Sequence, residues 1–281
     1  MLERVTPMQL LRHGTARRVP LVPMTPLQQV RAGRLPRRLV QLVVGLVLFG
    51  ATMALILRAG LGLEPWGVLT YGLIQHVPVS YGAMVVISSF VVLLLWIPLR
   101  QWPGLGTVAN ALVVGLATDA TLALVPPVEG LARQVPLMLL GVVGNGVAGA
   151  LYIGSQLGPG PRDGLMTGLH RRTGRSVRLV RTALEVTVVA VGWLLGGVLG
   201  VGTVVYALLV GPVVQAFLPL LTVPVDPPAP RQSESSSLRA SGSCRQDHTA
   251  AASAEVSSTN DTASAQRSAD PGSDTRETAT W

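Results

Sequence analysis

Residues 61–73 read LGLEPWGVLTYGL and residues 157–169 read LGPGPRDGLMTGL, so six of 13 positions are identical at an offset of 96 residues (157 − 61). The same offset aligns residues 104–115 with residues 200–211, where eight of 12 positions are identical. One ungapped offset that fits separated segments is typical of an internal repeat. The sequence therefore predicts a tandem duplication.

The composition is typical of a membrane protein. Of the 281 residues, 49% are hydrophobic and 13% are charged, and that charged share is about half of the ~25% usual in soluble domains. The hydrophobic residues stand in long blocks, which indicates helices that cross a bilayer. We therefore expect an all-α membrane protein whose first partner is the lipid bilayer.

The positive charge has a topological explanation. The net charge is +8 and every basic residue is Arg, which in a soluble domain would suggest nucleic-acid binding. Here the Arg residues flank the apolar stretches, and aromatic residues make up only 4% of the chain. Membrane topology accounts for this arrangement, so we expect no nucleic-acid partner.

The residue types that usually carry catalysis or bind metals form no recognisable group. Cys244 is the single cysteine and the four histidines are scattered, so the sequence predicts neither a disulfide nor a metal site. It also contains no Walker loop, His-Glu-x-x-His motif or Ser-His-Asp grouping. We expect a protein that is not an enzyme and that needs no cofactor.

The apolar pattern predicts six transmembrane helices, at residues 39–57, 81–99, 107–125, 135–157, 181–199 and 203–221. Each copy also has a segment after its first span that is too short to cross a bilayer, at residues 66–76 and 163–169, and we expect both to form half-helices. The predicted domains are a basic cytosolic extension (1–38), repeat 1 (39–126), repeat 2 (135–221) and a disordered polar tail (224–281).

The Arg distribution predicts the orientation. Eight Arg residues precede the first span and six lie in residues 158–181, whereas the connections 58–80 and 126–134 hold one each. Because basic segments stay inside, both termini should be cytosolic and the protein should lie in the cell membrane. Three spans per copy is an odd number, so the second copy should be inverted relative to the first, as in many secondary transporters.

The strongest candidate for a binding site is the segment 158–164, which reads GPGPRDG. A half-helix that starts after Gly160 and Pro161 would direct free N–H groups at a ligand, and Arg162 would add a forked anion donor. Asp163 could cap the helix, pair with Arg162 or bind a cation. The counterpart in the first copy is Glu64-Pro65-Trp66. The alternative is a tight Gly/Pro turn followed by a capped helix.

Two polar residues of the third predicted span are further candidates. Asp119 lies within an apolar run, where a carboxylate is costly and therefore suggests function, although a place near the helix end would remove that cost. Asn110 could line a solute path, or it could form a hydrogen bond to a neighbouring helix.

Several short motifs lie at characteristic positions: Pro65-Trp66, Trp96-x-Pro98-Leu99, Gly104-Leu-Gly-Thr107 with Asn110, the segment 158–166, and Gly202-Thr203 with Gly211-Pro212. In these motifs residues 39–221 resemble the YitT/YczE (YyaS) family of bacterial integral membrane proteins. The resemblance implies a polytopic plasma-membrane protein and no particular substrate. Relatives usually carry an acid at the position of Gly67, which aligns with Asp163, and this departure argues against a pair of carboxylates shared by the two copies.

Two classes of function are consistent with the sequence. The inverted repeat and the half-helices favour a secondary transporter or exporter of a small solute, which the anion donor Arg162 would suit if the solute were anionic. The small size and the long tail favour a membrane accessory protein that supports a biosynthetic, secretory or regulatory complex. The sequence does not fix the oligomeric state.

Overall fold

The computed structural model describes residues 26–225, which form nine helices and no strand. The helices are α1 (Pro26–Arg31), α2 (Leu35–Ala59), α3 (Pro65–Ile74), α4 (Tyr81–Trp96), α5 (Leu105–Leu124), α6 (Leu131–Gly154), α7 (Pro161–Thr173), α8 (Val177–Leu194) and α9 (Val201–Leu221). The all-helical prediction is confirmed for this part of the chain. The predictions for residues 1–25 and for nearly all of the tail, from residue 226 onward, fall outside the described residues.

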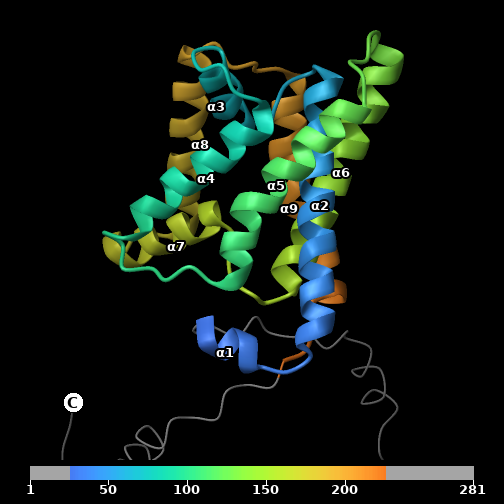
Figure 1. The fold of residues 1–281 in the computed structure, drawn as a ribbon. Helices are drawn as coiled ribbons and strands as arrows, with labels where there is room; N and C mark the ends of the chain where they lie inside the picture. Colours follow the sequence, from blue (N-terminus) through green and yellow to red (C-terminus); the bar gives the residue numbers. More distant parts are fainter. Residues whose placement is uncertain (1–25, 226–281) are drawn as a thin grey trace, which may run out of the picture. The chain divides into compact units, whose positions relative to one another are not determined.

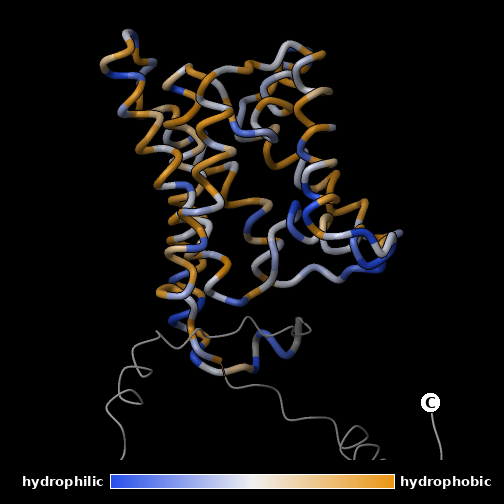
Figure 2. The backbone as a smooth tube through the Cα atoms, turned by 180° about the vertical axis from the view of Figure 1, so that it is seen from behind, coloured by the Kyte–Doolittle hydropathy of each residue, from blue (hydrophilic) through white to orange (hydrophobic). Residues whose placement is uncertain are grey.

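Four helices are long and apolar enough to cross a membrane, namely α2, α5, α6 and α9, while the apolar α4 is shorter at 16 residues. Figure 2 shows hydrophobic residues along most of the length of these helices. Many large apolar side chains point outward, among them Val40, Leu116, Leu140 and Leu208. Such exposure suits a lipid-facing surface.

The helix ends follow from local chemistry. Pro65 and Pro161 occupy the first turns of α3 and α7, where the missing N–H costs nothing. Ser176 accepts a hydrogen bond from Leu179 N at 3.3 Å, and this cap starts α8 four residues before the predicted span. Gly196 has a φ of 89°, which explains why α8 ends at Leu194 and does not continue to residue 199.

The long helices pack around α2. Helix α2 packs against both α5 and α6, and α6 also packs against α9. The buried residues of the largest core cluster come mainly from α2, α4, α5 and α6 and include Leu42, Leu46, Val85, Val114 and Tyr152. Across the bundle, α3 packs against α8 and α4 packs against α7. In Figure 1, α3 and α7 lie toward opposite ends of the long helices.

Residues related by the 96-residue offset make equivalent contacts. Gly106 N donates to Leu157 O at 2.8 Å, and Gly202 N donates to Leu61 O, also at 2.8 Å. Both members of the second pair are displaced by 96 residues from those of the first. The loop before α3 is thus held against the start of α9, and the loop before α7 is held against the start of α5.

Replacing Gly82 with alanine should destabilise the protein, because α4 and α5 approach closely at this position. A Cβ at residue 82 would lie 2.1 Å from Gly115 O, and overpacking of this kind costs about 1–3 kcal/mol. Thermal unfolding in detergent should show a lower Tm for Gly82→Ala. Gly211→Ala is the matched control, since a Cβ there would meet nothing within 4 Å; an equal loss in both variants would contradict the explanation.

Candidate functional site

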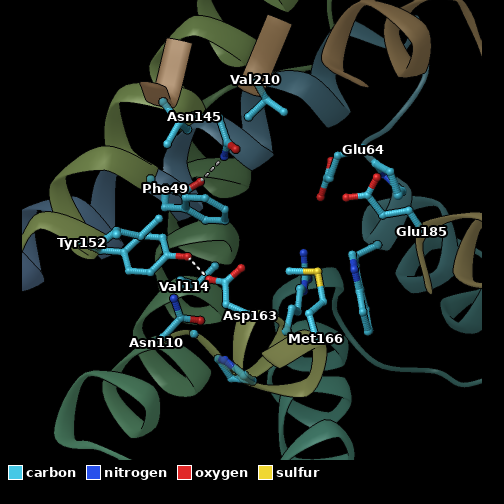
Figure 3. Close-up of a pocket in the computed structure, with 18 of the residues that line it drawn as sticks. Phe49, Glu64, Asn110, Val114, Asn145, Tyr152, Asp163, Met166, Glu185 and Val210 are labelled. Atoms are coloured by element: carbon cyan, nitrogen blue, oxygen red, sulfur yellow. Dashed lines mark hydrogen bonds between the residues drawn. The ribbon is translucent and has the colours of Figure 1, made fainter. Parts of the chain in front are cut away.

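The short helices α3 and α7 begin at the same cavity. The cavity has a volume of about 260 Å³ and is lined by Glu64, Pro65 and Trp66 at the start of α3 and by Gly160, Pro161, Arg162 and Asp163 at the start of α7. Figure 3 shows the labelled side chains Glu64 and Asp163 on different walls of this cavity. A volume of this size suits a small solute.

Seven of the eight residues singled out from the sequence line the cavity: Glu64, Trp66, Asn110, Gly160, Pro161, Arg162 and Asp163. The eighth, Asp119, is not among the lining residues. The structure thus brings together two segments that are 96 residues apart in the sequence.

Glu64 is the most unusual group of the cavity. It precedes the first residue of α3, its side chain is 3% exposed, and its backbone carbonyl accepts a hydrogen bond from Val68 N at 2.9 Å. Within residues 26–225 neither carboxylate oxygen has a hydrogen-bond partner. Arg162, which also lines the cavity, brings a positive charge to the same site.

Arg162 lies over an aromatic ring. Its guanidinium carbon is 5.0 Å from the centre of the Trp66 ring, which is within the range of a cation–π contact. The ion pair that the structure shows in residues 26–225 joins Arg181 Nε and Glu185 Oε1 at 2.8 Å. Arg162 lines the cavity and forms no ion pair within the described residues, so its guanidinium could serve an anionic group.

Asp163 is fixed by a tyrosine from α6. The hydroxyl of Tyr152 donates to Asp163 Oδ2 at 2.5 Å, and the Tyr152 ring meets Phe49 edge to face at a centroid distance of 5.8 Å. The carboxylate of Asp163 is thereby oriented at the third position of α7, where a negative charge also suits the helix dipole.

A second polar group lines the cavity between α2, α6 and α9. Tyr206 Oη donates to Asn145 Oδ1 at 2.9 Å, and Asn145 Nδ2 donates to Thr52 Oγ1 at 3.1 Å. Sequence reasoning missed Tyr152, Asn145 and Tyr206. A polar amide within a glycine-rich apolar span was the available signal for Asn145.

Asn110 and Asp119 have different surroundings. Asn110 lies beside the start of α7, because a Cβ at Gly160 would be 3.4 Å from Asn110 Nδ2. Asp119 holds the start of α4, where Gly82 N donates to Oδ1 at 2.7 Å and Ser80 Oγ donates to Oδ2 at 2.5 Å.

Replacing Asp119 with asparagine should therefore lower stability and leave the cavity intact. The change removes a charge from the N-terminus of α4, which typically costs about 1 kcal/mol. We expect a slightly lower Tm in detergent for the Asp119→Asn variant. A parental Tm would show that the hydrogen bonds to Asp119 do not hold the start of α4.

Comparison with known proteins assigns the family. Residues 36–219 match the profile described as a family of unknown function, DUF6198. The chain belongs to this family. It is 39% identical over 180 residues to an uncharacterized protein of Haemophilus influenzae, covering 64% of this chain and 83% of the relative.

Two Bacillus subtilis proteins are also similar to the DUF6198 chain. One is named uncharacterized membrane protein YczE, with 32% identity over 172 residues, covering 61% of this chain and 80% of the relative. The other is named uncharacterized protein YyaS, with 23% identity over 182 residues, covering 63% of this chain and 90% of the relative. The YczE/YyaS resemblance is confirmed, and with its apolar helices the chain is a membrane protein. No solved structure matches it.

Proposed function

We propose that this membrane protein is a secondary transporter of a small charged solute. The observation that carries the proposal is the shared cavity, since the starts of two short helices from different copies line it. Secondary transporters commonly place their substrate at interrupted helices where two repeats meet. The proposed activity includes no chemical step on the solute.

In this proposal the chain has six spans arranged as two inverted repeats, with α3 and α7 as half-helices. Helices α2, α4 and α5 form one copy, and α6, α8 and α9 form the other. The two hydrogen bonds related by 96 residues, from Gly106 N and Gly202 N, support this arrangement. So does the position of α3 and α7 toward opposite ends of the long helices (Figure 1).

The orientation that we propose puts both termini in the cytosol and the protein in the cell membrane. The end of α7 and the connection to α8 carry the exposed residues Arg171, Arg172 and Arg175. The connection between α3 and α4 holds no Arg. Basic connections remain on the cytosolic side, which puts residues 75–80 outside.

A flux screen tests the proposal. The full chain is reconstituted in liposomes, and the liposomes are loaded with one of several small amines, amino acids or carboxylates. Uptake of the labelled form of the same solute is then followed. We expect exchange of one group of solutes above the level of protein-free liposomes. Folded, inserted protein that exchanges none of them would support the alternative, a membrane accessory protein.

A further inference from the structure

The buried carboxylate of Glu64 lacks a hydrogen-bond partner within the described residues. The side chain is 3% exposed, lines the cavity and carries two oxygens without a hydrogen bond. A charged carboxylate in such a place is costly unless a positive group neutralises it. Arg162 is close enough to influence Glu64 electrostatically, but the two form no ion pair.

Each short helix has a carboxylate near its start, but the two carboxylates come from positions that do not align in the repeat. At the offset of 96 residues Glu64 aligns with Gly160, and Gly67 aligns with Asp163. A Cβ at Gly67 would lie 2.6 Å from Glu64 Oε1 and 2.7 Å from Oε2. The Glu64 carboxylate thus occupies the space that a side chain at position 67 would enter.

The second copy shows the converse arrangement. A Cβ at Gly160 would lie 3.3 Å from Asp163 Oδ2. In each copy one residue of the pair supplies the carboxylate and the other is a glycine that leaves room for it. The first short helix thus begins beside the carboxylate of Glu64 and the second beside that of Asp163.

The charges that line the cavity leave a negative excess. Of the residues that the structure describes, five charged ones line it: Glu64, Arg162, Asp163, Arg181 and Glu185. Arg181 and Glu185 form an ion pair with each other. Among the described lining residues this leaves the two carboxylates of Glu64 and Asp163 and the guanidinium of Arg162, so one added positive charge would balance the site.

We propose that Glu64 binds the positively charged nitrogen of a small organic solute, an alkylammonium group, and that Asp163 on another wall of the cavity adds to the negative field. That the protein transports this solute rests on the proposed function, whereas the binding of the solute does not. A buried carboxylate that faces a cavity is a natural counter-ion for such a group, and the Phe49, Trp66 and Tyr152 rings in the cavity wall suit the alkyl part.

Binding is tested on the purified full chain in detergent. Thermal unfolding is followed with methylammonium, ethylammonium or tetramethylammonium chloride, each against sodium chloride at equal concentration, and with sodium acetate as an anionic probe. A bound ligand raises the Tm as its concentration rises. We expect at least one alkylammonium to raise the Tm beyond sodium chloride.

Two charge-removing variants and one control assign the effect. Glu64→Gln keeps the size of the side chain and should weaken the apparent affinity at least about tenfold, as should Asp163→Asn. Glu129→Gln removes an exposed acid in the α5–α6 connection and should leave the affinity unchanged. Equal affinity in the parent and in Glu64→Gln would overturn the proposal.

The exchange of positions gives a sharper test. Glu64→Gly should lose alkylammonium binding, and the double variant with Glu64→Gly and Gly67→Asp should regain it, because its first copy then has the Gly/Asp arrangement of Gly160 and Asp163. Gly67→Asp alone should unfold at a lower temperature, since its side chain meets the Glu64 carboxylate. A double variant that is folded but does not bind would contradict the equivalence.

The outcomes separate this inference from the transport proposal. Alkylammonium binding without flux would support the site and reject the transporter. Flux of an anionic solute with no alkylammonium shift would support the transporter and reject the site. A response to sodium chloride equal to the alkylammonium response would also reject an organic solute.

Discussion

Replacing Arg162 with lysine should reduce solute transport at least about tenfold while the protein stays in the membrane at parental abundance. The guanidinium lies 5.0 Å from the centre of the Trp66 ring and borders the cavity. Lysine keeps the charge but loses the planar stack on the indole and the forked donor geometry. The measurement is uptake into liposomes per reconstituted protein.

A control on the same helix keeps this test specific. Arg171 is exposed near the end of α7, so Arg171→Lys should transport like the parent. Trp66→Leu, which removes the ring under Arg162, should resemble Arg162→Lys. Parental transport by Arg162→Lys at parental abundance would leave the segment 158–164 as a structural turn.

Replacing Arg38 with methionine should cause the largest loss of stability. Its side chain is fully buried, and the guanidinium donates to Gln29 O at 2.6 Å, Ser155 O at 2.8 Å and Gln156 O at 2.7 Å. Charge-assisted hydrogen bonds contribute about 1.5–3 kcal/mol each. Arg38 thereby connects α1, α2 and the segment that leads from α6 to the start of α7, and so it supports the position of Arg162 and Asp163.

The expected result is a loss of roughly 3 kcal/mol or more in unfolding free energy, seen as a large fall in Tm or as poor accumulation in the membrane. The neighbouring Arg37 is exposed, and Arg37→Met serves as the control with parental stability. A parental Tm for Arg38→Met would show that water or other groups satisfy these carbonyls.

The sequence was sufficient to predict the helices and many of the residues that line the cavity. Apolar blocks and the offset of 96 residues placed a helix at every predicted span, because hydrophobic length and repetition are local properties. Pro65 and Pro161 marked the starts of the short helices. The cavity between those starts depends on how helices that are distant in the sequence pack together, and sequence periodicity does not determine that packing.

Three features could not be predicted. Glu64 and Asp163 differ by three positions in the repeat alignment, so an ungapped comparison pairs each with a glycine. Only the backbone geometry shows that Glu64 occupies the space beside Gly67. Asp119 has an apolar context in the sequence, but its partner Gly82 belongs to another helix. Tyr152 reaches Asp163 through the fold and not through sequence spacing.

In the proposed topology, two copies of opposite orientation bring α3 and α7 to one cavity from opposite sides of the membrane. Cysteine accessibility tests this topology directly, with Val77→Cys or Thr173→Cys introduced in a Cys244→Ser background. Val77 is exposed just after α3, and Thr173 is the exposed last residue of α7. An impermeant maleimide added to intact cells should label the Val77→Cys variant. It should label the Thr173→Cys variant only after the membrane is opened. Labelling of both variants from the same side would contradict the account.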